Sequence, residues 1–219
     1  MKCFVSREEK DWQPIAAACS PMDVQWICQS LIHKSTVNFD LPERSFDWVF
    51  FSSQEAVHAF FDRQKPQNHL RYGAIGEGTA RALSKHTTPA FIGHNNNTEQ
   101  TAESFRKIAG TSAVLFPVSD ISLRTVQSHL PPAQVIDVVV YRTQLRTIPI
   151  PICDLYIFSS PSNVVAFFST NTIPQQAKAM AFGAKTAQKL TEFTDQSALV
   201  LDQLDVNSIA TAIKQIFLR

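Results

Sequence analysis

A strand-to-helix corner occurs twice in this chain of 219 residues. The first copy, at 50–61, reads FFSSQEAVHAFF, and the second, at 158–168, reads FSSPSNVVAFF. In each copy an apolar run ends in two serines, and apolar residues at helical spacing follow. A chain that repeats such a corner is expected to contain two related folding units and not one large core.

A glycine turn follows the serine corner in both copies, as AIGEGTARAL and AFGAKTAQKL. Ser53 precedes Gly76 by the same number of residues as Ser160 precedes Gly183. Each copy therefore has the same sequence of elements: strand, paired serines, helix, loop, strand, glycine turn and helix. This shared spacing predicts an internal duplication, with one copy in each domain.

Short apolar runs rich in Val, Ile and Phe alternate along the chain with longer segments of helical period. The alternation predicts the α/β class, with two doubly wound parallel sheets that carry helices on both faces. The expected strands are KCFVS, DWVFFSS, YGAIG, AVLFP, VIDVVVY, DLYIFSS, AMAFG and ALVL. The expected helices are QEAVHAFFDRQ, GTARALSKH, TAESFRKIAG, ISLRTVQSHL, SNVVAFFST, AKTAQKLTEF and VNSIATAIKQIF.

Two extended segments that end in proline, SLIHKSTVNFDLP and VVVYRTQLRTIPIP, flank the first copy and are suited to pair as a two-stranded hinge. Residues 1–32 are too few to fold alone, so we expect them to join residues 145–219 in a discontinuous α/β domain. The second α/β domain, residues 40–138, is then inserted into the first. The hinge strands are expected at 33–39 and 139–144.

The overall charge and hydropathy exclude several classes of partner. The formal net charge is +1 and lysine and arginine do not cluster, so we expect no nucleic-acid partner. No apolar stretch approaches the roughly 20 residues that span a bilayer, and the first residues, MKCFVSREEKDWQ, lack the apolar core of a signal peptide. We therefore expect a cytoplasmic monomer that does not bind membranes.

The cysteines and histidines do not form a metal-binding pattern. The four cysteines show no CxxC spacing, and no two of the six histidines stand at the i, i+4 spacing of a helical zinc site. We expect free thiols that pack as small hydrophobic side chains. The sequence therefore predicts no metal.

The serine corners and the glycine turns are candidate anion-binding sites. Ligands of open parallel sheets bind outside the carboxyl ends of the strands, where the next helix presents unpaired N–H groups and the positive end of its dipole. Glycine lets the backbone approach a ligand, and threonine adds a hydroxyl. The alternative is that these hydroxyls only cap their helices. The candidates at these corners are Ser53, Gly76, Thr79, Ser160, Gly183 and Thr186.

The motifs follow one another in a definite order: VSR, FFSSQEAVHAF, AIGEGTARAL, LFPVSDISLRTVQSHL, VVVYRTQ, FSSPSNVVAFF and AFGAKTAQKL. In this order, and near these spacings, they resemble the uroporphyrinogen-III synthase family over nearly the whole chain. Each motif alone is a generic corner, so the ordered set carries the resemblance. It implies two α/β domains joined by a two-stranded hinge, with the substrate in the cleft between them.

The resemblance also implies a reaction. A linear tetrapyrrole polycarboxylate, hydroxymethylbilane, would lose water and close to uroporphyrinogen III with its last ring inverted, without a cofactor. A polycarboxylate suits a site built from helix N-termini and hydroxyl groups. Loss of the hydroxyl and attack by the pyrrole are intrinsically easy steps, so the enzyme is expected to act mainly by bending the chain before closure.

Position by position, the resemblance places the family's proposed catalytic tyrosine at Tyr141, within VYRT. A phenol there would assist departure of the hydroxyl as a weak acid. The alternative is a half-buried tyrosine that packs the hinge.

Three more residues are candidates for contact with substrate carboxylates. Arg7 falls on the family's basic residue after the first strand, and Ser119 ends the AVLFP strand. Ser119 is favoured over Asp120, because a carboxylate would repel the substrate. Arg124, in the helix expected next, would either meet a carboxylate or lie on a solvated face. Glu55 departs from the family pattern and is unfavourable near a polyanion unless it points away.

Two other functions fit parts of the sequence. A non-catalytic protein with two lobes and a hinge could close on a small molecule without reaction. A nucleotide-binding enzyme is suggested by GAIGEGTA, but these glycines do not fit GxGxxG and no acidic residue ends a strand about 20 residues later.

Overall fold

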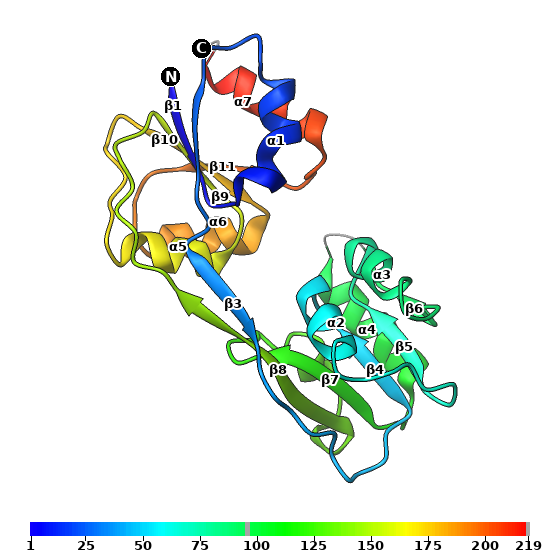
Figure 1. The fold of residues 1–219 in the computed structure, drawn as a ribbon. Coiled ribbons are helices and arrows are strands. Elements are labelled where there is room, and N and C mark those ends of the chain that lie inside the picture. The colour runs from blue at the N-terminus through cyan, green and yellow to red at the C-terminus, as the bar shows by residue number, and fades with distance from the viewer. Residues whose placement is uncertain (95–96, 218–219) are drawn as a thin grey trace. The chain divides into compact units, whose positions relative to one another are not determined.

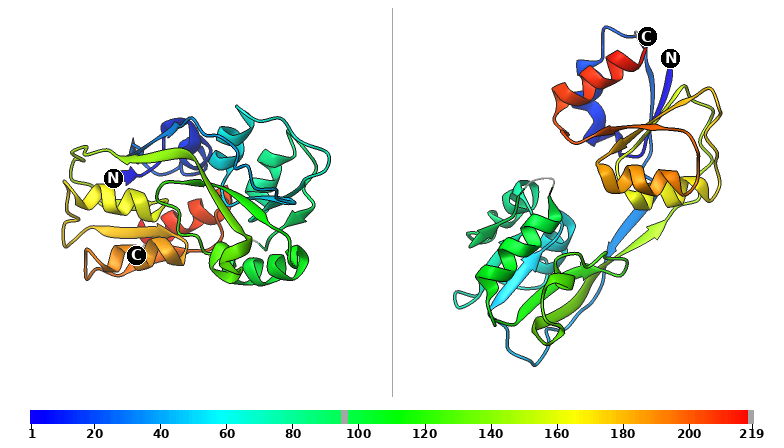
Figure 2. Two further views of the ribbon diagram at one scale, coloured as in Figure 1. Left: turned by 90° about the horizontal axis from the view of Figure 1, so that it is seen from below. Right: turned by 180° about the vertical axis from the view of Figure 1, so that it is seen from behind.

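The structure, a computed structural model that describes residues 1–94 and 97–217, contains two compact units (Figure 1). The terminal unit consists of residues 1–33 and 144–219, and the inserted unit consists of residues 34–143. Each unit is built around one sheet with helices packed on both faces (Figure 2). The prediction of two α/β units is confirmed.

The terminal unit has a five-stranded parallel sheet in the order β11-β10-β9-β1-β2. One face packs against α1 and α7, and the other packs against α5 and α6. The strands are β1 (Lys2–Val5), β2 (Gln25–Cys28), β9 (Leu155–Phe158), β10 (Lys178–Phe182) and β11 (Ala198–Leu201). The helices are α1 (Glu9–Ala18), α5 (Pro161–Phe168), α6 (Ala184–Thr191) and α7 (Val206–Phe217).

The inserted unit has a six-stranded sheet in the order β3-β8-β7-β4-β5-β6. Helices α2 and α3 cover one face, and α4 covers the other. The strands are β3 (Ile32–Thr36), β4 (Trp48–Phe51), β5 (Arg71–Ala74), β6 (Phe91–Ile92), β7 (Val114–Ser119) and β8 (Val135–Leu145). The helices are α2 (Gln54–Phe61), α3 (Glu77–Leu83) and α4 (Thr98–Ala109).

Strands β3 and β8 carry the chain from one unit to the other (Figure 1). They are neighbours in the sheet, and two backbone hydrogen bonds extend the pairing at its ends. Val37 N donates to Val140 O at 3.0 Å, and Arg146 N donates to Leu31 O at 2.8 Å. From Leu31 to Val37 the residue numbers rise along β3, while their partners fall from Arg146 to Val140 along β8, so the two strands run antiparallel. The remaining pairs of this sheet are parallel.

The two sheets share one plan, and their connections are circularly permuted. The duplicated segment β4-α2-β5-α3 occupies the same place in its sheet as β9-α5-β10-α6 occupies in the other. The two strands on the other side of β4, β7 and β8, come later in the chain, whereas the two on the corresponding side of β9, β1 and β2, come at its start. The terminal unit therefore needs both ends of the chain to complete its sheet.

The central strands are apolar on both faces because helices cover both sides of each sheet. All residues of β4 (WVFF) and β9 (LYIF) are buried. Phe105 of α4 packs against Trp48 and Phe50 of β4, with ring centroids 5.3 and 4.4 Å away, and against Phe91 of β6. These aromatic contacts hold α4 on the sheet of the inserted unit.

One expected helix is absent. The segment ISLRTVQSHL contains only a short 3₁₀ turn, Gln127–His129, and Arg124 adopts the left-handed backbone with φ of 53°. A non-glycine residue in that conformation interrupts the helical hydrogen bonds. Val126 and Leu130 still pack on the sheet. The spacing of apolar residues therefore predicted correctly that these side chains are buried, but wrongly that the segment is helical. The sequence reading also missed α1, β2 and β6.

We predict that Phe105→Ala lowers the free energy of unfolding by about 3–5 kcal/mol, because it removes a fully buried ring that contacts three other aromatic residues. Ile108→Ala, on the same helix but 51% exposed, is the matched control and should change stability by about 0.5 kcal/mol or less. Urea titration followed by circular dichroism measures both. Equal effects of the two substitutions would contradict the packing described for α4.

Candidate functional site

In each sheet the direction of the strand order reverses between two adjacent central strands. The reversal lies between β4 and β7 in the inserted unit and between β1 and β9 in the terminal unit. Ligands of open α/β sheets bind at such points. The serine corners predicted from the sequence stand there, because β4 ends before Ser53 and β9 ends before Ser160.

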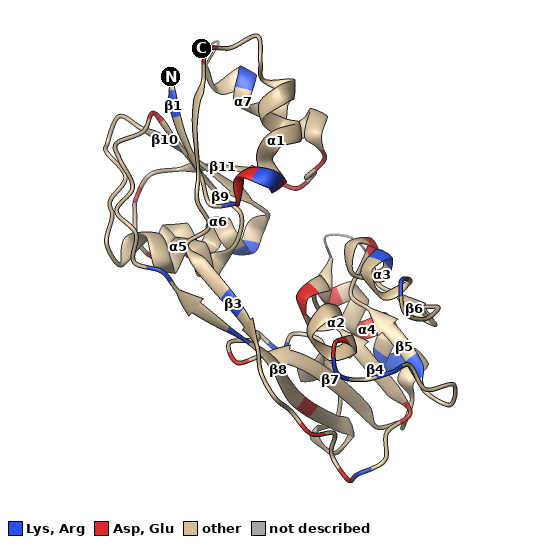
Figure 3. Cartoon of the chain, viewed as in Figure 1, with Lys and Arg blue, Asp and Glu red and all other residues tan. Residues whose placement is uncertain are grey.

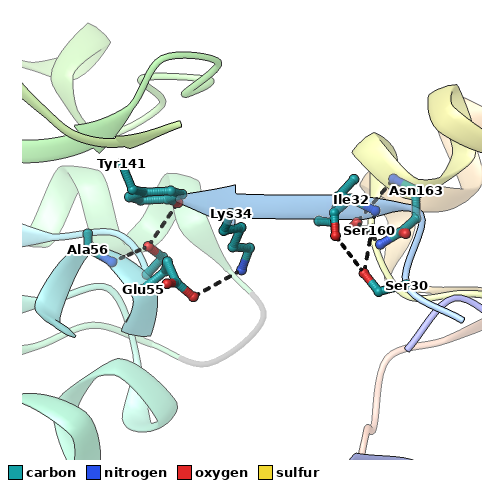
Figure 4. Close-up of polar contacts among 9 residues, drawn as sticks. Ser30, Ile32, Lys34, Glu55, Ala56, Tyr141, Ser160 and Asn163 are labelled. Carbon is teal, nitrogen blue, oxygen red and sulfur yellow. Dashed lines mark hydrogen bonds and ion pairs between the residues drawn. The ribbon is translucent and has the colours of Figure 1, made fainter. Parts of the chain in front are cut away.

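In the inserted unit, Ser53 and Tyr141 meet at the carboxyl edge of the sheet. Ser53 is the N-cap of α2, and its Oγ accepts a hydrogen bond from Ala56 N at 3.1 Å. The Tyr141 hydroxyl lies 3.3 Å from the same Oγ, as the dashed line from Tyr141 in Figure 4 shows. The tyrosine is 8% exposed, so its ring is fixed by the core and its hydroxyl is directed at the start of a helix. Ser119, at the end of β7, pairs with Tyr141 in the ladder.

A β-bulge aims the tyrosine. The register between β7 and β8 shifts between Val118 and Ser119. As a result Val140 and Tyr141, which are consecutive, both pack into the same core cluster, whereas regular strand residues point to opposite faces. Bulges commonly redirect a side chain beside a functional site. The strand pattern in the sequence gives no sign of this shift.

An ion pair lies beside these hydroxyls. Lys34 Nζ, on β3, is 3.5 Å from Glu55 Oε2, in the first turn of α2 (Figure 4). The two side chains are 40% and 35% exposed. The glutamate therefore does not stand alone at this edge. Lys34 was not singled out by the sequence pattern, because its partner is distant along the chain.

At the two glycine turns, Gly76 is buried and Gly183 is partly exposed. Gly183 has φ of 80°, a conformation that favours glycine, and a Cβ there would meet nothing within 4 Å. Gly76 is extended, with φ of −178°, and caps α3. The threonines that follow are almost fully buried, Thr79 at 6% and Thr186 at 2% exposure. Their hydroxyls are therefore less accessible to a ligand than we predicted from the sequence.

In the terminal unit, Asn163 ties the second serine corner to the start of the hinge. Ser160 Oγ accepts hydrogen bonds from Asn163 N at 3.3 Å and from Asn163 Nδ2 at 3.0 Å. Figure 4 shows Asn163 beside Ser160. Asn163 Oδ1 also accepts a hydrogen bond from Leu31 N, immediately before β3, at 2.8 Å. Asn163 is 2% exposed. The sequence reading missed this residue, although an asparagine three positions after a capping serine was the available signal.

Ser6 and Ser159 close the switch point of the terminal sheet. Ser159 N donates to Ser6 Oγ, and Ser159 Oγ donates to Ser6 O, both at 2.8 Å. The two hydroxyl oxygens are 3.1 Å apart. These bonds hold the ends of β1 and β9 side by side. They therefore fix the positions of the next residues in each segment, Arg7 and Ser160.

Arg7 remains at the carboxyl edge of the terminal sheet. Its guanidinium lies over the ring of Phe182, at the end of β10, 5.3 Å from the centroid. Burial lowers the pKa of Arg7, and the carboxylate of Asp11 opposes this effect. Arginine remains protonated in proteins, so Arg7 offers a partly desolvated charge that suits a carboxylate ligand.

Arg124 is not brought together with the other candidates. Its Nε lies 3.0 Å from Asp137 Oδ2, an acid on β8. Asp137 pairs with Phe116, which precedes the carboxyl end of β7, so the guanidinium is held away from the edge where Ser119 lies. An internal acid already balances its charge.

No metal or membrane feature emerges from residues 1–94 and 97–217. This part of the chain has no group of three or more His, Cys, Asp or Glu residues placed to hold a metal ion, and none of its helices is long and apolar enough to cross a bilayer. All four cysteines are free. Burial raises the pKa of Cys3 to about 12, and of Cys28 and Cys153 to about 11, so these thiols stay protonated near neutral pH.

We predict that Asn163→Ala lowers the free energy of unfolding by about 1–3 kcal/mol, because it leaves the N–H of Leu31 without its partner. Asn207→Ala, an exposed position in the first turn of α7, is the control and should have little effect. Thermal and urea unfolding of the two variants measure the difference. Equal stability would show that the link from α5 to the hinge is dispensable.

The chain matches the family model described as uroporphyrinogen-III synthase HemD over residues 15–210. It is similar to the solved structure of uroporphyrinogen-III synthetase from Helicobacter pylori, with 17% identity, a TM-score of 0.70 and coverage of 99% of this chain and 100% of that one. It is also similar to a mutant uroporphyrinogen III synthase from Thermus thermophilus, with 16% identity, a TM-score of 0.64 and 98% coverage of both chains.

At these identities the solved structures show the fold alone, and no curated protein matches the chain. The family model, however, spans far more than half of the sequence. It confirms the resemblance drawn from the ordered motifs. The chain belongs to the uroporphyrinogen-III synthase family, and its function lies in haem biosynthesis.

Proposed function

We propose that the protein is a cofactor-independent lyase that closes hydroxymethylbilane to uroporphyrinogen III with loss of water and inversion of ring D. The observation that carries this proposal is the contact between the Tyr141 hydroxyl and Ser53 Oγ at the start of α2. It supplies a weak acid, a hydrogen-bonding partner and the positive end of a helix dipole in one place. Membership of the family supports the substrate and product.

In this proposal Tyr141 donates its proton to the departing hydroxyl of the substrate, which leaves as water. The phenolate that remains is stabilised by Ser53 and by the N–H groups at the start of α2. The substrate becomes an azafulvene cation, and its terminal pyrrole attacks this cation through its own substituted carbon to give a spiro intermediate. The bond from that carbon to the neighbouring methylene then breaks and re-forms at the unsubstituted carbon of the same ring, and the proton released there returns to the Tyr141 phenolate. Because both steps are intrinsically easy, the main contribution of the protein is to hold the bilane in the bent conformation that favours the inverted product.

We further propose which groups bind the substrate's carboxylates. In the inserted unit they are the hydroxyls of Ser53 and Ser119 and the backbone of Gly76 with the helix start at Thr79. Arg124 is omitted because Asp137 already holds it. In the terminal unit they are Arg7, the hydroxyl of Ser160, and the backbone from Gly183 to Thr186 at the start of α6. Helix N-termini and hydroxyls bind anions without a large basic surface, and this agrees with the mixed charges of both units (Figure 3).

We also infer that the protein works as a monomer in the cytoplasm and does not bind nucleic acid. The free, protonated thiols are typical of a reducing compartment. The near-balance of 20 basic and 19 acidic residues gives no broad positive field for a phosphate backbone. Size-exclusion chromatography with light scattering tests whether the protein is a monomer.

We predict that Tyr141→Phe lowers kcat several-fold without unfolding the protein, because the phenol is the proton donor while the ring alone supplies the packing. Tyr72→Phe is the matched control: Tyr72 is buried in the same unit, and its hydroxyl accepts from Gln67 N at 2.8 Å. That substitution should affect stability and leave turnover unchanged.

In the assay, the protein receives enzymatically generated hydroxymethylbilane. The products are then oxidised to porphyrins, and the type I and type III isomers are separated by chromatography. Unchanged turnover in Tyr141→Phe would assign the tyrosine a structural role. If the unmodified protein yields only type I product at the spontaneous rate, the proposed reaction is wrong, and a non-catalytic binding protein becomes the better description.

A further inference from the structure

The ion pair between Lys34 and Glu55 lies next to the proposed acid. Glu55 is two residues after Ser53, whose Oγ contacts the Tyr141 hydroxyl. Lys34 belongs to β3, which pairs with the strand that carries Tyr141. Figure 3 shows the two charges as the blue segment of β3 and the red segment of α2. The ion pair and the tyrosine are thus linked through the first turn of α2 and through the pairing of β3 with β8.

The pair is loosely held. Its nitrogen and oxygen are 3.5 Å apart, whereas charge-assisted N–H···O bonds are typically about 2.7–2.9 Å long. Both side chains keep more than a third of their surface in water, so solvent weakens the attraction. The pair can therefore exchange partners at little cost when another carboxylate arrives.

The start of α2 favours an anion. Backbone N–H groups and the helix dipole make the first turn electropositive, and Glu55 supplies negative charge there in the absence of substrate. Asp120, which follows β7, and Arg142, on β8, are two other charged residues of this edge. Asp120 Oδ1 accepts from Thr143 N at 3.0 Å, and Arg142 is exposed while its neighbour Tyr141 is buried.

We propose that Lys34 is a substrate-binding residue and that Glu55 is an internal competitor that occupies Lys34 until a carboxylate of the substrate replaces it. The inference rests on the proposed function. A pyrrole-ring carboxylate near Tyr141 is attracted by Lys34 and repelled by Glu55. When it replaces Glu55, it interacts with both the Lys34 ammonium and the electropositive start of α2. Ligands without carboxylates gain nothing from the exchange, and Lys34 thereby contributes to specificity.

We expect Lys34→Met to raise the KM for hydroxymethylbilane roughly tenfold with little change in kcat, because it removes a charged partner of the bound substrate. Lys34→Arg should restore most of the affinity. Glu55→Gln should lower KM several-fold, because it removes the competitor and its repulsion. This gain should shrink in the Lys34→Met background, since the two residues act through the same contact.

The matched control is the pair Lys189–Glu192 on the surface of α6, whose side chains are 32% and 53% exposed. Lys189→Met and Glu192→Gln should leave KM unchanged. Binding of uroporphyrin III, the oxidised form of the product, followed by quenching of its fluorescence, gives a second readout that needs no turnover. The same order of affinities is expected there: Glu55→Gln tightest and Lys34→Met weakest.

The two proposals fail in different ways. If type III product forms normally but KM and porphyrin affinity are the same in the Lys34 and Glu55 variants as in the unmodified protein, the inference about the ion pair is wrong and the function stands. If Glu55→Gln weakens binding, Glu55 supports the site instead of competing with the substrate, and the inference is equally wrong. If no type III product forms from the unmodified protein, the function fails, and the porphyrin titration still decides the role of Lys34.

Discussion

Burial of both faces of a parallel sheet is the constraint on which the rest of this protein depends. Strands such as β4 and β9 are apolar throughout, so each must leave the sheet at the same edge and enter a helix that covers one face. Every such exit places a helix N-terminus at the carboxyl edge. The unpaired N–H groups there need oxygen partners, and Ser53 and Ser160 supply the first of them. The anion-binding character of the edge is therefore a consequence of how the core is buried.

The permuted plan of the two sheets explains the organisation of the chain. The terminal sheet places β1 beside β9, and the hydroxyls of Ser6 and Ser159 bind across that junction. The first and last segments of the chain thus fold together, and the inserted unit is a complete copy of the same plan carried by β3 and β8. Asn163 joins this arrangement to the site, because it binds both the cap of α5 and the backbone just before β3.

The three cations considered as substrate contacts each have a partner within their own unit. Arg7 lies over Phe182 in the terminal unit. In the inserted unit Arg124 is neutralised by Asp137, away from the carboxyl edge, and Lys34 pairs with Glu55. A protein with a net charge of +1 can still bind a polycarboxylate if backbone amides and hydroxyls do most of the binding and a few cations exchange partners. This arrangement favours an acidic ligand of the right shape over anions in general.

The sequence by itself determined the local features: the α/β class, the two capped corners at Ser53 and Ser160, and the duplication, because caps and apolar periods depend on residues close together in the chain. It failed at ISLRTVQSHL, where a helical period proved to mark burial without helix. Contacts between distant residues were decided only by the tertiary structure. Tyr141 meets Ser53 across 88 residues of sequence, and Asn163 meets Leu31 across 132. The bulge in β8 and the partner of Lys34 likewise depend on how strands align, and no local pattern of residue types encodes that alignment.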